Sequence, residues 1–239
     1  MRRLWIAALL APALTLAAPA VALAAPSVHA EQTAPVSART LQFGMHGSAV
    51  RTLQRRLAAL KYYPGAIDGH FGTSTLEAVW AFQEVQRLPG EDFVSSAMQR
   101  ALNHPRAPRV LDAAAGPNRI EVNIGIEVLV LYKHNHVQLI SHVSSGGGYY
   151  YCSPRGGCGV AITPTGNYRT RSFFPGWLAV PPGFMYNSVF FIGTAFAIHG
   201  DTDVPLAPVS HGCIRIPMDI AVFFHKLVMI PGEPVIIRR

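Results

Sequence analysis

The chain has 239 residues, half of them hydrophobic, and a formal net charge of +7 at pH 7. Its lysines and arginines form no cluster with interleaved aromatic residues, which argues against a nucleic-acid partner. Beyond the N-terminus, no stretch is apolar for long enough to cross a bilayer. The basic charge therefore reflects either anionic partners of another kind or ordinary solvated surface.

Residues 1–24 have the features of a secretory signal peptide. Arg2 and Arg3 form a basic start, an Ala/Leu-rich stretch follows, and 22–24 is a small-x-small cleavage site; a later cut after Ala30 is the alternative. The apolar stretch is short for a membrane span, so we expect cleavage and no stable membrane anchor afterwards. A basic exported protein suits the anionic polymers of a cell envelope.

A polar segment without periodicity, residues 31–40, is expected to be a spacer. From residue 41 apolar side chains recur at helical spacing, which predicts two amphipathic helices. Ser74 and Glu77 read as a capping box at the start of the second helix, and a third helix is expected over about Ser95–Leu102. The apolar positions on which the two helices depend are Val50, Leu53, Leu57 and Leu60, then Leu76, Val79 and Phe82.

A turn-rich connector with several glycines, residues 62–72, lies between the first two helices. With the helical pattern around it, residues 41–103 resemble the three-helix peptidoglycan-binding domain, although the match weakens at 91–94. The apolar positions report packing of a small core. The residues that the resemblance leaves for contact with glycan or peptide are Tyr62, Tyr63 and Asp68.

Residues 104–117 contain three prolines and predict an interdomain linker. After it the period changes to alternation, with a hairpin around 133–135. Many short strands, Gly/Pro turns and one late helix at about Met218–Leu227 predict a β-rich sandwich or barrel over 118–239. The fold class is therefore α+β with two domains, a small all-α three-helix domain followed by the β-rich one.

Two of the three cysteines lie in one Gly-rich loop, at Cys152 and Cys158, close enough to bridge. Because export favours pairing, we expect a disulfide there, with Cys213 left as a free thiol. Metal binding by the same pair is a weaker alternative, since the loop holds no histidine or third cysteine.

Cys213 lies in the run Ser210-His211-Gly212-Cys213-Ile214-Arg215, and a second histidine precedes it at Ile198-His199-Gly200. A free thiol in an oxidising compartment needs a reason to persist, and nucleophilic catalysis assisted by an imidazole is one. His199 comes from a separate segment and suits the base, whereas His211 is expected to flank the thiol or substrate. Gly212 lets the backbone bend, and the N–H groups of Gly212 and Cys213 are oxyanion-hole candidates.

This motif resembles the active site of the L,D-transpeptidases, which remodel bacterial peptidoglycan. The resemblance covers about residues 118–239, including the segments 144–146 and 163–166. Arg215 stands where many members carry asparagine, and the loop before Ser210 is somewhat shorter. The resemblance implies an L,D-transpeptidase-type catalytic domain in a bacterial envelope or secreted protein, with roles in cell-wall biogenesis and cell shape.

On this resemblance, Cys213 forms a thioester with a donor stem peptide and releases D-alanine, with His199 as base and the Gly200 carbonyl holding its ring. An acceptor amine then completes the crosslink, whereas water would make the enzyme an L,D-carboxypeptidase. His211, Gly212, Ser210 and Arg215 are assigned to the oxyanion and substrate. Arg215 either binds a substrate carboxylate or forms a structural ion pair.

The segment 173–187 is expected to be either a mobile cap over the cleft or an ordered aromatic wall. Its candidate lid residues are Trp177, Met185 and Tyr186. No cofactor and no metal are expected. Two other classes remain as alternatives: a zinc peptidase with ligands among His199, Asp201, Asp203 and His211, and a non-catalytic peptidoglycan-binding protein.

Overall fold

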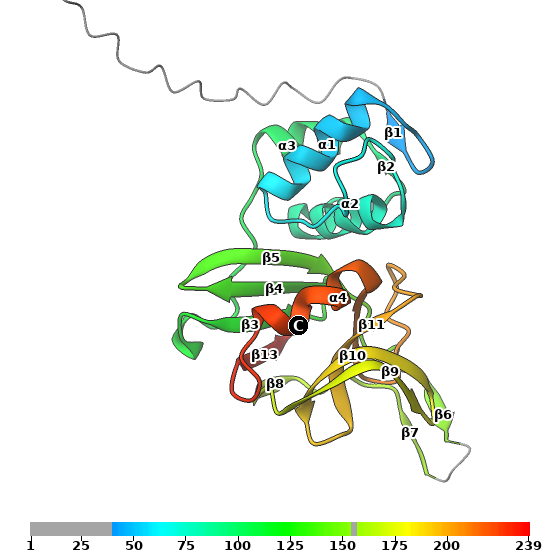
Figure 1. Cartoon of the computed structure of the whole chain (residues 1–239), viewed down its shortest axis with the longest axis vertical. Coiled ribbons are helices and arrows are strands. Elements are labelled where there is room, and N and C mark those ends of the chain that lie inside the picture. The colour runs from blue at the N-terminus through cyan, green and yellow to red at the C-terminus, as the bar shows by residue number, and fades with distance from the viewer. Residues whose placement is uncertain (1–39, 154–156) are drawn as a thin grey trace, which may run out of the picture. The chain divides into compact units, whose positions relative to one another are not determined.

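The computed structural model describes residues 40–153 and 157–239, all within one compact unit, Thr33–Arg239 (Figure 1). The expected signal peptide and nearly all of the expected spacer lie outside the described residues. None of the helices in the described part of the chain combines the length and the apolar character needed to span a membrane.

The N-terminal domain contains the three expected helices, with a short strand pair added. Its elements are β1 (Leu41–Gln42), α1 (Ser48–Ala59), α2 (Thr73–Gln86), β2 (Phe93–Val94) and α3 (Ser96–Asn103). The predicted apolar face of α1 is fully buried at Val50, Leu53 and Leu57. The Ser95 side chain caps α3 by accepting a hydrogen bond from the Met98 amide. Helical spacing of apolar residues thus identified the domain's core.

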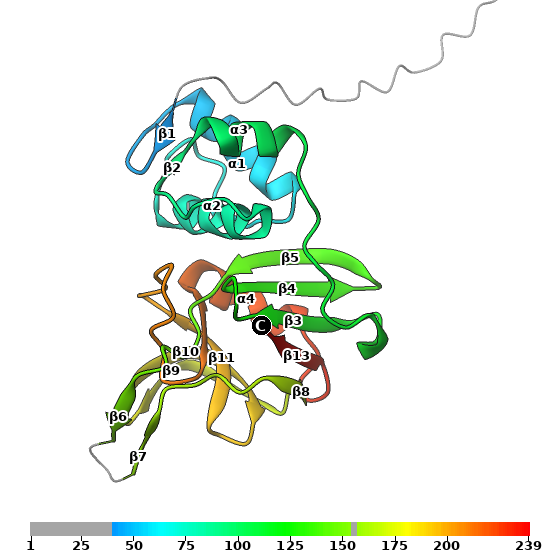
Figure 2. The same cartoon turned by 180° about the vertical axis from the view of Figure 1, so that it is seen from behind.

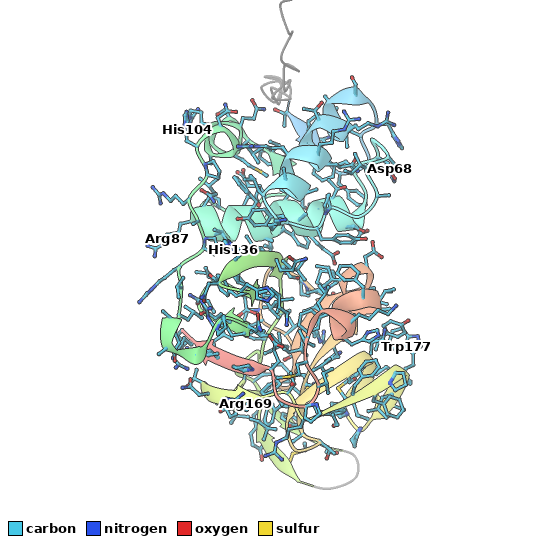
Figure 3. All side chains as sticks on the ribbon, turned by 60° about the vertical axis from the view of Figure 1, so that its left-hand side comes forward. Asp68, Arg87, His104, His136, Arg169 and Trp177 are labelled. Carbon is cyan, nitrogen blue, oxygen red and sulfur yellow. A yellow bond between two sulfur atoms is a disulfide. The ribbon has the colours of Figure 1, made fainter. Side chains whose placement is uncertain are left out.

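The predicted capping box at Ser74 and Glu77 is wrong. Helix α2 begins at Thr73, so its N-cap is Gly72, which has no side chain to cap the helix. Ser74 lies in the first turn, and its hydroxyl donates to Asp219. Tyr62 is also not exposed as expected: only 2% of it is accessible, so it packs in the core. Asp68 remains at the surface, in the connector after α1 (Figure 3).

The C-terminal domain is built on two sheets (Figures 1 and 2). One has the strand order β5-β4-β3-β13-β8 and the other β12-β11-β10-β9, while β6 and β7 form a separate hairpin. The pairs β3–β13 and β11–β12 are parallel, and the remaining pairs are antiparallel. A short 3-10 turn, η1 (Ala113–Ala115), interrupts the linker that leads into this domain.

The bounds of these elements are β3 (Arg119–Asn123), β4 (Val128–Lys133), β5 (His136–His142), β6 (Tyr150–Cys152), β7 (Cys158–Val160), β8 (Gly166–Arg169), β9 (Ser172–Val180), β10 (Gly183–Ile192), β11 (Phe196–Asp201), β12 (Ile214–Pro217), α4 (Met218–Leu227) and β13 (Pro234–Arg238). The late helix and the hairpin around residues 133–135 lie where the sequence predicted them. His134 and Asn135 form that turn with positive φ angles of 51° and 63°.

The two sheets and α4 enclose the main core of this domain. Val122 of β3 packs in one cluster with Phe191 of β10, Ile198 of β11 and Phe224 of α4. Each of these four side chains is at most 2% exposed. The domain is therefore a β-rich sandwich with one helix, as expected.

Strand β4 is buried on both faces. Leu129 and Leu131 belong to the sandwich core, whereas Val128 and Val130 pack in a second cluster with residues of α1, α2 and α3. Alternation along a strand places these two sets on opposite faces. The continuous apolar run of β4 follows from this double burial.

The segment expected to be a cap or a wall is a β-hairpin. Strands β9 and β10 pair through it, with Trp177 opposite Tyr186 and Leu178 opposite Met185. The pairing has one register shift, between Tyr186 and Ser188, so the segment is strand rather than loop. Its role as a cap or a wall stays a prediction. Trp177 projects from β9 with half of its surface exposed (Figure 3), while Met185 is buried.

Candidate active site

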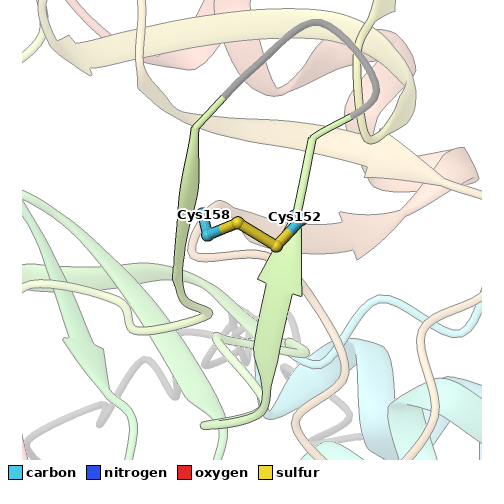
Figure 4. The surroundings of a disulfide bond; sticks show 2 residues. All are labelled: Cys152 and Cys158. Atoms are coloured by element: carbon cyan, nitrogen blue, oxygen red, sulfur yellow. A yellow bond between two sulfur atoms is a disulfide. The ribbon is translucent and has the colours of Figure 1, made fainter.

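Two neighbouring strands carry the motif residues. Cys213 directly precedes β12, and His199 lies within β11, which pairs with β12 in parallel. The register places His199 opposite Arg215. Cys213 is a free, half-buried cysteine, whereas Cys152 and Cys158 form a disulfide across the β6–β7 hairpin (Figure 4). The parallel pair thus brings together motif segments separated in sequence.

A cavity of about 620 Å³ lies over this strand pair. It is within the size range of small-molecule sites. Several predicted residues line it, namely His199, Ser210, His211, Cys213, Arg215, Trp177 and Met185, together with Asp201, Asp203 and Phe184. Tyr186 does not line the cavity and instead packs against Trp177, with ring centroids 5.1 Å apart.

His199 is buried and fixed by the backbone. Its Nδ1 lies 3.0 Å from the carbonyl oxygen of Gly200. Since a carbonyl only accepts, Nδ1 carries the proton and Nε2 presents a lone pair. Burial lowers the pKa of His199 below its ordinary value, although the Gly200 contact and the charge of Asp201 oppose this. At neutral pH the imidazole is therefore neutral and able to accept a proton.

Burial also controls the Cys213 thiol, whose pKa it raises above the ordinary value. The sulfur lies 3.8 Å from the carbonyl oxygen of Ala195 and 3.9 Å from Met185 Sδ. Burial thus favours the neutral forms of both the thiol and the imidazole. Such a pair needs proton transfer at the moment of attack.

The side chain of Ser210 stabilises the turn before Cys213. Ser210 Oγ donates to the Cys213 carbonyl at 2.5 Å and accepts from the Gly212 amide at 3.0 Å. That contact corrects one expectation, because the Gly212 N–H is occupied and does not point free as an oxyanion donor. Gly212 has φ of 136°, and a Cβ there would lie 2.8 Å from the Ile162 carbonyl oxygen. The position therefore requires glycine.

Thr163 supports the same turn from another segment, a role that sequence reasoning missed. Its buried hydroxyl donates to the Gly212 carbonyl at 2.8 Å and accepts from the Gly146 amide at 2.8 Å. Neighbouring backbone bonds join Ser144 to Arg215 and Gly147 to Ser210. The only signal in the sequence was that segments 144–146 and 163–166 fitted the family pattern.

Arg215 is engaged by two aspartates. Its Nε lies 3.1 Å from Asp201 Oδ2, and its Nη1 donates to the Asp203 carbonyl oxygen at 3.2 Å. The structure therefore contains the ion pair that was one of the two interpretations. Arg215 also lines the cavity, so a substrate carboxylate would share the guanidinium with Asp201.

The zinc-peptidase ligand set does not assemble in the part of the chain that the structure describes. There, no three His, Cys, Asp or Glu residues are grouped so as to hold a metal ion. Asp201, one of the proposed ligands, is paired with Arg215. This pairing favours a thiol–imidazole site over a metal centre.

Comparisons with known proteins match both domains. A model described as a putative peptidoglycan binding domain matches residues 46–92, and one described as the L,D-transpeptidase catalytic domain matches 117–237, just over half of the chain. The crystal structure of an L,D-transpeptidase from Xylanimonas cellulosilytica is 28% identical, with a TM-score of 0.79 over 85% of this chain and 100% of that chain.

A curated relative, the N-acetylmuramoyl-L-alanine amidase CwlM of Mycobacterium tuberculosis, is 38% identical over 76 residues. This match covers 30% of the chain but only 19% of the relative's own length. The likeness is therefore confined to a short segment and carries no argument about the activity of this chain.

Proposed function

Because this chain belongs to the L,D-transpeptidase family, with a peptidoglycan-binding domain ahead of its catalytic domain, we propose that it is an exported acyltransferase that crosslinks peptidoglycan stem peptides through Cys213. The single observation that carries the proposal is the cavity shared by the free thiol and the neutral His199. Export is proposed from the signal-like residues 1–24.

In the first step, Cys213 Sγ attacks the carbonyl carbon that precedes the terminal D-alanine of a donor tetrapeptide. His199 Nε2 takes the thiol proton, the C–N bond breaks, and the same proton passes to the departing amine. A thioester and free D-alanine result. The Cys213 amide is the proposed oxyanion donor, since the Gly212 amide is engaged by Ser210.

In the second step, an amine from a neighbouring stem peptide attacks the thioester carbon. His199 accepts the proton of the attacking amine and returns it to the thiolate as the C–S bond breaks. Water in place of the amine yields the carboxypeptidase reaction, so exclusion of water decides the outcome. Trp177, Phe184 and Met185 give one wall of the cavity an apolar character that favours the amine over water.

The test compares the secreted protein with its Cys213→Ala variant on purified disaccharide-tetrapeptide, with products followed by mass spectrometry. We expect D-alanine and crosslinked dimers from the wild type and neither from the variant. Tripeptide without dimers would assign the carboxypeptidase instead. If the wild type leaves the substrate intact but the protein is retained on peptidoglycan, the non-catalytic binding protein is the remaining interpretation.

A further inference from the structure

The ring of His211 is packed between two tyrosines on the side of the motif next to the β6–β7 hairpin. The centroid of Tyr151 lies 4.6 Å from that of His211 with the planes at 85°, and that of Tyr149 lies 5.4 Å away at 82°. The two tyrosine rings also contact each other, at 6.4 Å and 69°. Edge-to-face contacts of this geometry are favourable and orient the rings.

The hairpin that supplies these rings is fastened to the motif. The Tyr149 hydroxyl donates to the Val209 carbonyl at 3.1 Å, directly before Ser210. The Ala161 amide donates to the Tyr149 carbonyl at 2.9 Å. Further along, Tyr151 pairs with Gly159, and the next pair in the register is Cys152 with Cys158, joined by the disulfide (Figure 4). The covalent bond thus closes the strand pair that carries Tyr151.

Neighbouring tyrosines on this strand have different surroundings. Tyr150 is 71% exposed and pairs with Val160, which is also exposed. Because successive side chains of a strand point to opposite faces, Tyr151 is directed to His211 while Tyr150 is directed away from it. The strand therefore offers a matched pair of tyrosines, one in contact with the site and one outside it.

A histidine ring that is free to turn has broad χ2 preferences, so packing has to select one orientation. An edge-to-face contact biases the ring orientation by roughly 2- to 10-fold. We propose that Tyr151 and Tyr149 are positioning residues that hold His211 against the Cys213 cavity, and that the Cys152–Cys158 bond maintains this arrangement. Only the predicted effect of these tyrosines on turnover rests on the proposed function; the predicted orientation of the His211 ring does not.

The direct test compares Tyr151→Leu with the control Tyr150→Leu and the conservative Tyr151→Phe. We expect Tyr151→Leu to lower kcat/KM for D-alanine release by about 10-fold while Tyr150→Leu leaves it unchanged. Tyr151→Phe retains the ring and should restore activity. Equal kcat/KM for Tyr151→Leu and Tyr150→Leu would overturn the proposal.

A second readout needs no activity. The NMR signal of the His211 ring Cε1 proton reports the flanking aromatic rings, and it should move in Tyr151→Leu but not in Tyr150→Leu. This separates the positioning proposal from the proposed function, because it remains decisive in an inactive protein. The Cys152→Ser/Cys158→Ser double variant should broaden or shift the same signal. An unchanged signal there would refute the role of the disulfide.

Discussion

Replacing Gly200 by alanine should disturb the site through the packing of β11 on α4. A Cβ built at Gly200 lies 2.5 Å from the Ala221 Cβ, 3.1 Å from Met218 Sδ and 3.4 Å from the Tyr186 Cβ. Carbon atoms in contact prefer about 3.5–4.0 Å, so β11 and α4 have to separate by roughly 1 Å. Since β11 is paired on both sides, with β10 and with β12, the strand has little freedom to move.

Overpacking of this kind costs about 1–3 kcal/mol in the free energy of unfolding. For a chain of this size, each kcal/mol lowers the Tm by about 2–4 °C. The Gly200 carbonyl also fixes the ring of His199, and a displacement of about 1 Å in a reacting group can reduce kcat about 100-fold. Gly200→Ala should therefore lose both stability and activity.

The matching variant is Ala221→Gly, which removes the methyl group that Gly200→Ala would meet. Alone it should destabilise α4 by about 0.5–1 kcal/mol. In the double variant, urea unfolding should show a favourable coupling of about 1 kcal/mol or more, and D-alanine release should recover. If the losses in unfolding free energy of the two single variants simply add in the double variant, the steric explanation is refuted. A Gly200→Ala protein with wild-type stability and turnover would refute it as well.

Thr163→Val leaves the buried Gly212 carbonyl and the partly buried Gly146 amide without their partner, so it should cost about 1–3 kcal/mol in urea unfolding, whereas Thr163→Ser should keep stability and turnover. Because burial raises the pKa of Cys213, alkylation by iodoacetamide should have its midpoint above pH 9.0; a midpoint near neutrality would indicate a thiolate–imidazolium pair. The lowered pKa of His199 keeps its imidazole unprotonated into mild acid. The acid limb of the kcat/KM profile should therefore have its midpoint below pH 6.5. Burial opposes the charge of His142, but its 2.7 Å contact with Glu84 raises its pKa, and burial raises the pKa of Glu84 to about 7. Both groups bind their protons more tightly in the folded protein, so the stability that they contribute is lost as pH rises through about 7. As pH rises through this range, the urea midpoint of the wild type should decrease, and that of His142→Gln should decrease less.

The parts of the fold that the sequence predicted are those specified by local pattern. Apolar residues at helical spacing located α1 and α2, and the β-branched runs on either side of the turn at His134 located β4 and β5. The motif around Cys213 was recognisable because its residues are contiguous, with His199 a short distance before them. These signals need no knowledge of which distant segments meet.

The features of the fold and the site that the sequence did not predict depend on contacts between segments far apart in the chain. Thr163 meets Gly212 across 49 positions, and nothing near Thr163 identifies that partner. Ser74 is a residue type favoured at helix N-caps, yet the helix begins at Thr73 and the Ser74 hydroxyl donates to the distant Asp219. Tyr62 lies in a turn-rich connector, where exposure is the ordinary expectation, but it packs against Phe82 of α2. Tertiary contacts overrode the local signal in each case.

The most direct test of the account is the intact mass of the protein after incubation with donor tetrapeptide in the absence of an acceptor amine, with an acid quench. We predict an added mass equal to the donor minus D-alanine, located by proteolysis on the peptide that contains Cys213 and absent from Cys213→Ala. Release of D-alanine that persists in Cys213→Ala, or an adduct on another residue, would contradict the assignment of Cys213 as the nucleophile.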